Sequence, residues 1–187
     1  MPRKTDWQYA IDELQAYANK ACEEAAKHAQ KLLTEKAQEL MDKYYDEYSP
    51  NRYDRTNNLH DNAIKPLYNL HGTNHMGGVT ISSEAMEEYK KLVPDESKGV
   101  GILGKYYTEE IIPGEKNKVV DNWFEGIHPN AIPERFTGTP TNNKEALKAY
   151  RDEIAPLCAN YGKAQALRSG VFPYVHKAVS RMKLKGE

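Results

Sequence analysis

The sequence predicts an α+β fold with a long N-terminal helix, a small antiparallel sheet with short helices, and C-terminal helices. Residues 5–48 contain neither glycine nor proline and repeat apolar or small side chains at helical spacing. Residues 49–140 are rich in turns and in short β-branched or aromatic segments. We therefore expect a single domain, 1–187, with a long projecting helix (1–48), a small β-rich region (49–140) and a C-terminal helical region (141–187).

Composition limits the class of protein. The 187 residues are 39% hydrophobic and 28% charged, which suits one globular domain with a real core. The chain has no run of 18 apolar residues, and its first ten residues lack the apolar segment of a signal peptide. Cys22 and Cys158 are too few for a disulfide framework or a zinc knuckle, so we expect a reducing cytoplasm.

The N-terminal helix is expected to begin after a cap at Thr5 or Asp6 and to end before the turn that Pro50 imposes. At a rise of about 1.5 Å per residue it would be roughly 60 Å long, more than a core of this size covers. Part of its face should then pack on another chain, unless it folds back over its own domain or breaks in its alanine-rich middle. Alanines at 18, 21, 25 and 29 would allow close helix approach.

The pattern of residues 49–140 predicts short helices and strands. Its expected features are a turn over Asn74–Gly78 inside a hairpin, a strand over Val79–Ile81, a helix over Glu84–Leu92 capped by Ser83, and a strand over Lys105–Ile112. Val119–Phe124 has helical spacing, and Gly126 can end that element.

The C-terminal region begins at Asn142, which with Glu145 has the spacing of a capping box. A helix should follow to Tyr161, with a kink at Pro156, and Gly162 and Gly170 should interrupt the pattern. Pro173 can open a last helix. Residues 163–187 carry six Lys or Arg against one acid, and we expect this basic end to dock on an acidic face of a neighbouring subunit or partner. The four basic residues of that last helix and its tail are Lys177, Arg181, Lys183 and Lys185.

Two motifs resemble ligand sites but lack the required context. Residues 99–104 match GxGxxG, yet a dinucleotide site needs a buried strand before the motif and a helix after it. His71 and His75, with His60 or Asp61, could offer metal ligands, but glycines make this segment a pliable loop. Nucleophile elbows, P-loops and paired catalytic carboxylates are missing from the sequence. We expect no enzyme activity, no metal and no cofactor.

A tyrosine cluster precedes an Arg-Thr pair at the end of the long helix. Its tyrosines could stack on bases, but Tyr44–Arg55 holds two arginines against three acids, which favours a protein interface or core packing. We expect Arg55 to fix the junction between helix and sheet. The expected interaction residues here are Tyr44, Tyr45, Tyr48, Tyr53 and Arg55.

Three short segments, in this order and spacing, resemble the tail-completion and head–tail joining minor proteins of long-tailed, siphovirus-type bacteriophages. They are Arg55–Leu59, Gly78–Ser82 and Trp123–His128, and the resemblance covers roughly residues 44–130. Pro133–Phe136 is a looser version of the family's Pro-x-Pro-aromatic segment, and both ends of the chain are longer than the family pattern.

The resemblance implies a structural virion protein that joins or completes the tail at the neck, as part of a homo-oligomeric ring assembled in the host cytoplasm. Implied partners are further copies of itself and connector, tail-terminator or tail-tube proteins. No membrane and no specific nucleic acid are implied, although such a ring can lie near the DNA channel. The alternatives are another connector component, an adaptor or stopper, and less favourably a nucleic-acid-binding protein.

Overall fold

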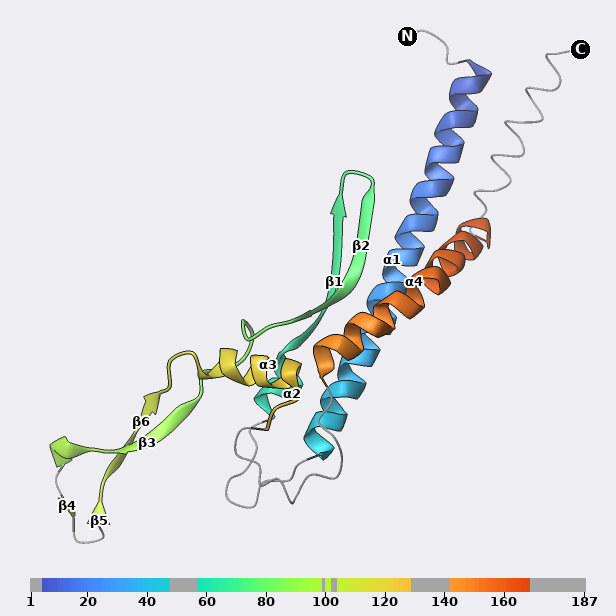
Figure 1. Ribbon diagram of the computed structural model, residues 1–187. Coiled ribbons are helices and arrows are strands. Elements are labelled where there is room, and N and C mark those ends of the chain that lie inside the picture. Colours follow the sequence, from blue (N-terminus) through green and yellow to red (C-terminus); the bar gives the residue numbers. More distant parts are fainter. Residues whose placement is uncertain (1–4, 48–56, 99, 102–103, 129–141, 169–187) are drawn as a thin grey trace, which may run out of the picture. The chain divides into compact units, whose positions relative to one another are not determined.

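The chain folds as an α+β protein, as the sequence predicts. The structure, a computed structural model, describes residues 5–47, 57–98, 100–101, 104–128 and 142–168 (Figure 1). The chain divides into two compact units, one of residues 1–37, 66–79 and 147–187 and the other of residues 38–65 and 80–146. The described helices include none that is long and apolar enough to cross a membrane.

Helix α1 (Asp6–Asp46) is continuous over 41 residues, which confirms the expected long helix. A reciprocal capping box opens it, because Gln8 Oε1 accepts from the Thr5 backbone N–H at 2.7 Å and Thr5 Oγ1 accepts from the Gln8 N–H at 3.4 Å. Ion pairs one turn apart support its solvent side, among them Lys27–Glu23 at 2.6 Å and Lys20–Glu24 at 2.8 Å.

In the first unit, α4 (Asn143–Arg168) and the hairpin of β1 (Ile64–His71) and β2 (Asn74–Ile81) pack on α1 (Figure 1). Leu33, Ile154 and Cys158 form the centre of its core. Partly buried apolar side chains pack around them: Ala29, Leu32, Val79 and Tyr150.

Two glycines set how closely these elements approach α1. A methyl group on Gly77 would lie 1.7 Å from the Ala26 carbonyl oxygen, and one on Gly162 would lie 2.2 Å from the Ala21 carbonyl oxygen and 2.8 Å from the Ala25 Cβ. Gly162 therefore lies inside α4 rather than ending it, because only glycine fits against the alanine stripe of α1. The close approach expected from these alanines is confirmed, and its partner is the same chain.

In the second unit, α2 (Asn58–Asn62) contacts α3 (Glu115–Glu125), and both lie beside the last turns of α1. Gly126 ends α3 in the left-handed conformation at φ 69°, as expected. Asn142 Oδ1 accepts from the Glu145 N–H at 3.0 Å and begins α4, while Asn143 Nδ2 donates to the Trp123 carbonyl oxygen at 2.7 Å. The buried apolar side chains of this unit are Leu40, Met41, Leu59, Ala63, Met86, Val120 and Trp123.

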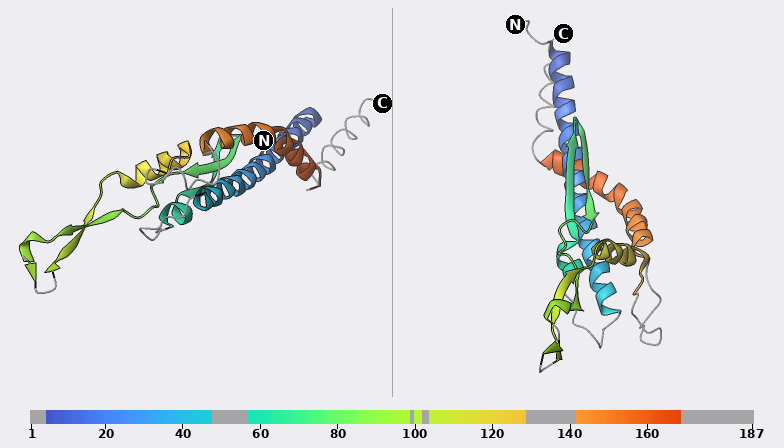
Figure 2. Two further views of the ribbon diagram at one scale, coloured as in Figure 1. Left: turned by 60° about the horizontal axis from the view of Figure 1, so that its bottom comes forward. Right: turned by 90° about the vertical axis from the view of Figure 1, so that its left-hand side faces the viewer.

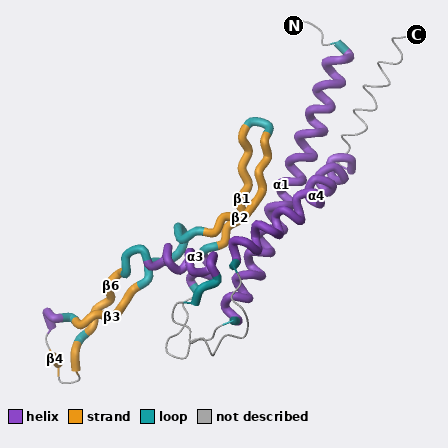
Figure 3. Tube along the Cα trace, viewed as in Figure 1, coloured by secondary structure: helices purple, strands orange, loops and turns teal. Residues whose placement is uncertain are grey.

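The remaining strands of this unit form two-stranded ribbons (Figure 3). Strand β3 (Lys90–Pro94) pairs antiparallel with β6 (Tyr107–Ile111), and Leu92 lies opposite Glu109. Between them come a 3₁₀ turn (Glu96–Lys98) and the short pair β4 (Val100–Gly101) and β5 (Gly104–Lys105). The described strands thus form three two-stranded sheets instead of the one small sheet expected.

Two local predictions are wrong. Asn74–Gly78 lie within β2, and the hairpin turns at Gly72–Thr73, where Gly72 has a φ of 62°. Residues 84–92 form no helix, since Lys90–Pro94 pairs with β6 instead. Lys91 forms the cross-strand pair with Glu110 at 3.2 Å, so a distant strand overrides the local helical pattern.

Other elements agree with the sequence more closely. The strand expected over 105–112 is present as β5 and β6, and α4 continues through Pro156 and curves along its length (Figure 2). Tyr48, the turn at Pro50, Gly170 and the last helix expected from Pro173 lie outside the described residues.

Gly77 and Gly78 provide a matched pair for testing the packing on α1. We expect Gly77→Ala to destabilise the protein by about 1–3 kcal/mol, because the added methyl group meets the Ala26 backbone. Gly78→Ala meets nothing within 4 Å and should leave stability unchanged or slightly raised. Thermal unfolding of the two variants decides the matter, and equal melting temperatures would contradict this packing.

Candidate functional site

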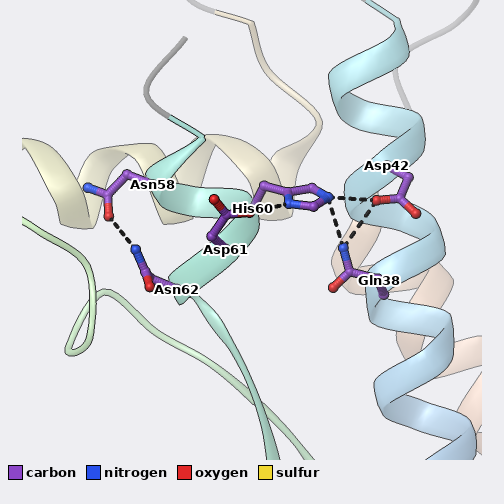
Figure 4. A network of polar contacts seen from close by, with 6 residues as sticks. All are labelled: Gln38, Asp42, Asn58, His60, Asp61 and Asn62. Carbon is purple, nitrogen blue, oxygen red and sulfur yellow. Dashed lines mark hydrogen bonds and ion pairs between the residues drawn. The ribbon is translucent and has the colours of Figure 1, made fainter.

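A network of polar side chains in the second unit surrounds His60 on α2 (Figure 4). His60 Nδ1 lies 2.7 Å from Asp61 Oδ1, and His60 Nε2 lies 2.8 Å from Asp42 Oδ1 on α1. Gln38, one helical turn before Asp42, places its Nε2 at 3.0 Å from His60 Nε2 and donates to Asp42 Oδ1 at 3.1 Å. Because Gln38, Asp42 and His60 come from two helices, the cluster fastens α2 to the end of α1.

The two carboxylates favour the charged imidazolium. The hydrogen bond with Asp61 raises the pKa of His60, and Asp42 acts in the same direction against the opposing effect of partial burial. The hydrogen bond from His60, followed by the one from Gln38, lowers the pKa of Asp42. A charged ring can donate from both nitrogens to carboxylates, whereas a neutral ring can donate from Nδ1 and accept the Gln38 amide at Nε2. Since Nε2 lies 2.8 Å from Asp42 Oδ1, the charged ring makes one more hydrogen bond to a carboxylate than the neutral ring does.

Asn58 joins α2 to the loop after β2 (Figure 4 shows its contact with Asn62). Its Nδ2 donates to the Glu87 carbonyl oxygen at 2.8 Å, and its Oδ1 accepts from the Glu87 N–H at 3.0 Å and from Asn62 Nδ2 at 3.1 Å. Asn58 is buried, so these bonds satisfy a polar group that would otherwise be costly. The preceding Asn57 has a left-handed φ of 53° that asparagine tolerates better than most residues.

Two of the predicted interaction residues pack within this unit. Tyr44 OH donates to the Ile127 carbonyl oxygen at 2.7 Å, and its ring stacks on His128 with centroids 4.0 Å apart. His128 is nearly buried, and its Nε2 lies 3.6 Å from Glu47 Oε2. The Tyr45 ring meets the His60 ring edge-on at 5.5 Å. Tyr44 and Tyr45, both half-buried, thus make contacts within this unit, and their expected role in an interface stays a prediction.

The other expected interaction residues lie outside the described part of the chain: Tyr48, Tyr53, Arg55, Lys177, Arg181, Lys183 and Lys185. Among described residues, the sequence reasoning missed Asp42 and Gln38, because nothing in a helical sequence shows which side chain will meet a histidine some 20 residues later. Asn58, which belongs to the resembling segment Arg55–Leu59, forms two hydrogen bonds with the Glu87 backbone.

His71 and His75, the histidines considered as metal ligands, have different surroundings in the structure. His75 Nε2 contacts Asn19 Oδ1 at 2.8 Å and its Nδ1 contacts Tyr68 OH at 2.8 Å, so both ring nitrogens link the hairpin to α1 or to itself. His71 is exposed on β1. Over the described ranges, no group of three His, Cys, Asp or Glu side chains is placed to hold a metal ion. Likewise Gly104 opens a strand, not the helix that a dinucleotide motif requires.

The His60 cluster predicts a pH-dependent contribution to stability. Since the folded-state pKa of His60 is raised, its contribution is complete below the unfolded value of about 6.5 and is lost as pH rises through the folded value. His60→Gln should therefore lower the free energy of unfolding more at about pH 5.5 than at pH 9. The difference should be less than about 1 kcal/mol, since the partners are largely exposed. Denaturant unfolding at both pH values measures this. His71→Gln is the control, and a pH-independent His60→Gln difference would contradict the cluster.

The hydrogen bonds of Asn58 predict a larger, pH-independent effect. Asn58→Ala removes both hydrogen bonds between this buried side chain and the Glu87 backbone and should cost about 2 kcal/mol. Asn62→Ala removes only one bond to the same side chain and should cost about 1 kcal/mol or less. Chemical denaturation compares the two variants. Equal losses in the free energy of unfolding would show that the Glu87 contacts do not stabilise the fold more than the Asn62 contact does.

Comparisons with known proteins identify no relative of this chain. Neither a protein-family model, nor a curated protein, nor a solved structure is significantly similar to the chain.

Proposed function

We propose that this protein is a structural, non-catalytic virion component of a tailed bacteriophage, joining or completing the tail at the neck as part of a homo-oligomeric ring. Its partners are neighbouring copies and connector, tail-terminator or tail-tube proteins. Ring assembly takes place in the host cytoplasm. A closed ring requires heterologous contacts, in which two different surfaces of each subunit meet.

The observation that carries this proposal is the apolar face of the β3–β6 ribbon. The strand register places Leu92, Tyr107 and Ile111 on the same face, since Lys90 lies opposite Ile111, Leu92 opposite Glu109 and Pro94 opposite Tyr107. Leu92 is 69% exposed, Tyr107 57% and Ile111 52%. Side chains of this size on one exposed face mark a contact surface.

The ribbon also lacks support of its own. All five residues of β6 are exposed, and a two-stranded sheet is marginally stable in water unless it packs against something else. Packing in an assembly would supply that missing face. The ribbon is thus better explained as part of an interface than as part of the subunit's core.

The charges of the ribbon favour a protein partner over nucleic acid. Lys90 pairs with Glu109 at 2.8 Å, and Lys91 pairs with Glu110 at 3.2 Å. These ion pairs neutralise lysines that a phosphate-binding surface would leave available. The Lys90–Glu109 pair lies on the same face as Leu92, Tyr107 and Ile111, and the Lys91–Glu110 pair lies on the opposite face. A surface that mixes exposed apolar side chains with paired charges is typical of a protein interface.

The arrangement of the resembling segments supports the same proposal. Asn57–Leu59 opens α2, Trp123–His128 closes α3, and these two helices contact each other. The Ser82 N–H, in the remaining segment, donates to the Ala63 carbonyl oxygen just after α2 at 3.1 Å. Short motifs that are far apart in the sequence thus meet in one unit, which is expected where they specify a common framework.

Leu92→Ser tests the ribbon as an interface. Losing a large apolar group at an interface core should weaken assembly by at least tenfold in dissociation constant, or about 1.4 kcal/mol, with little loss of subunit stability because Leu92 is exposed. Sedimentation velocity over a concentration series measures this. Leu157→Ser is the control, because Leu157 is 61% exposed but lies on α4. Assembly unchanged by Leu92→Ser would remove the ribbon from the interface.

Deleting the gene tests the role in the virion. A joining protein contributes surface and no covalent step, so the lysate should hold DNA-filled heads and separate tails, with a loss of infectious particles. Electron microscopy of the lysate gives the answer, and adding purified protein should restore joining. Empty heads would indicate a role in packaging, absent capsids a role in head assembly, and normal infectious particles would contradict the proposal.

A further inference from the structure

The start of α1 carries an apolar stripe that no described residue covers. Trp7, Ile11 and Leu14 recur one turn apart, and they are 71%, 51% and 52% exposed. They continue the stripe whose next members, Ala21 and Ala25, face Gly162 of α4. The stripe is therefore covered by α4 in the middle of α1 and uncovered towards the N-terminus.

Contacts within the first unit show where α4 leaves α1. Lys36 Nζ lies over the Tyr150 ring at 5.6 Å, and the His28 and Tyr161 rings stack at 3.9 Å. Residue numbers rise along α4 as they fall along α1, so the helices are antiparallel (Figure 1). From Gly162, the last six residues of α4 advance about 9 Å, which brings Arg168 to the level of roughly residue 17 of α1.

The chain continues from this point with residues 169–187, which lie outside the described part. As a helix, 19 residues would extend about 28 Å, enough to pass Leu14, Ile11 and Trp7. Their sequence has apolar side chains at helical spacing, at Phe172, Val175, Val179 and Met182. If the antiparallel register of α4 continued, Val175 would reach the level of Ile11 and Val179 that of Trp7.

The charges of the two segments are complementary. Residues 5–19 hold three acids, Asp6, Asp12 and Glu13, and no Lys or Arg, whereas residues 169–187 hold four Lys or Arg and one acid. Glu13 Oε2 is shielded from solvent and has no hydrogen-bond donor among the described residues. The acids disfavour pairing of this face with its own counterpart in a second copy, since like charges would meet.

We propose that residues 171–185 of the same chain dock on the start of α1, with Val175 and Val179 on the Trp7–Leu14 stripe and the basic side chains beside Asp6, Asp12 and Glu13. The acidic surface that binds the basic C-terminal residues then belongs to the same subunit. This docking extends the α1–α4 pair to the N-terminal end of α1 and leaves the β3–β6 ribbon as an exposed surface for assembly. It does not depend on the proposed function.

Cysteine cross-linking in the full-length chain tests the docking. Ile11→Cys with Val175→Cys is made in a Cys22→Ser background, because Cys22 is exposed, while Cys158 is buried and its burial raises the pKa of its thiol. Mild oxidation should give a fast-migrating monomer on a non-reducing gel. The control pair, Ile11→Cys with Leu157→Cys, should give no such monomer. Leu157 of α4 lies level with a residue of α1 about 18 positions after Ile11, so the two thiols cannot meet.

Tryptophan fluorescence provides a second readout. Trp123 is fully buried, so acrylamide quenching reports mainly on Trp7. Reversing Lys177, Arg181, Lys183 and Lys185 to Glu should shift the emission to the red and increase quenching of Trp7, whereas changing the three lysines to Arg should not. Disulfide-linked dimers in place of the monomer would show that a second copy occupies the stripe. Absence of the cross-link, or quenching unchanged by charge reversal, would equally overturn the proposal.

Discussion

The fold of the first unit depends on the close contact between two glycines and the backbone of α1. Gly77 of β2 lies against the Ala26 carbonyl, and Gly162 of α4 lies against the Ala21 carbonyl. Side chains at either position would push the hairpin or the helix away from α1 and open the core around Leu33, Ile154 and Cys158. The middle of α1 is rich in alanine and has few large side chains. The backbones of β2 and α4 can therefore approach it closely.

Histidine–tyrosine contacts connect elements in both units. In the first unit, His28 stacks on Tyr161 and His75 contacts Tyr68, and in the second, His128 stacks on Tyr44 and His60 meets Tyr45. Each pair joins residues from different elements, or from the two strands of a hairpin. An aromatic ring with polar atoms can pack and hydrogen-bond at once, which suits a small core with little aliphatic area. These contacts give His28, His60, His75 and His128 a structural role in their units.

The sequence predicted the elements whose signals are local. The long helix followed from the absence of glycine and proline, the end of α3 from Gly126, and the start of α4 from Asn142 and Glu145. It failed at Glu84–Leu92 and at Gly162, where a partner distant in the sequence decides: β6 captures Lys90–Pro94, and α1 requires a glycine within α4. The His60 cluster was out of reach for the same reason, because Asp42 and His60 meet only after α2 packs on α1.

In the proposed ring, the β3–β6 ribbon contacts a neighbouring subunit through its exposed side chains Leu92, Tyr107 and Ile111. Hydrogen exchange of backbone amides, measured in the free subunit and in the assembled ring, tests this most directly. Residues 90–94 and 107–111 should exchange quickly in the subunit and become protected on assembly, while residues 21–41 of α1 should be protected in both states. Equal exchange of the ribbon in both states, with new protection elsewhere, would contradict the account.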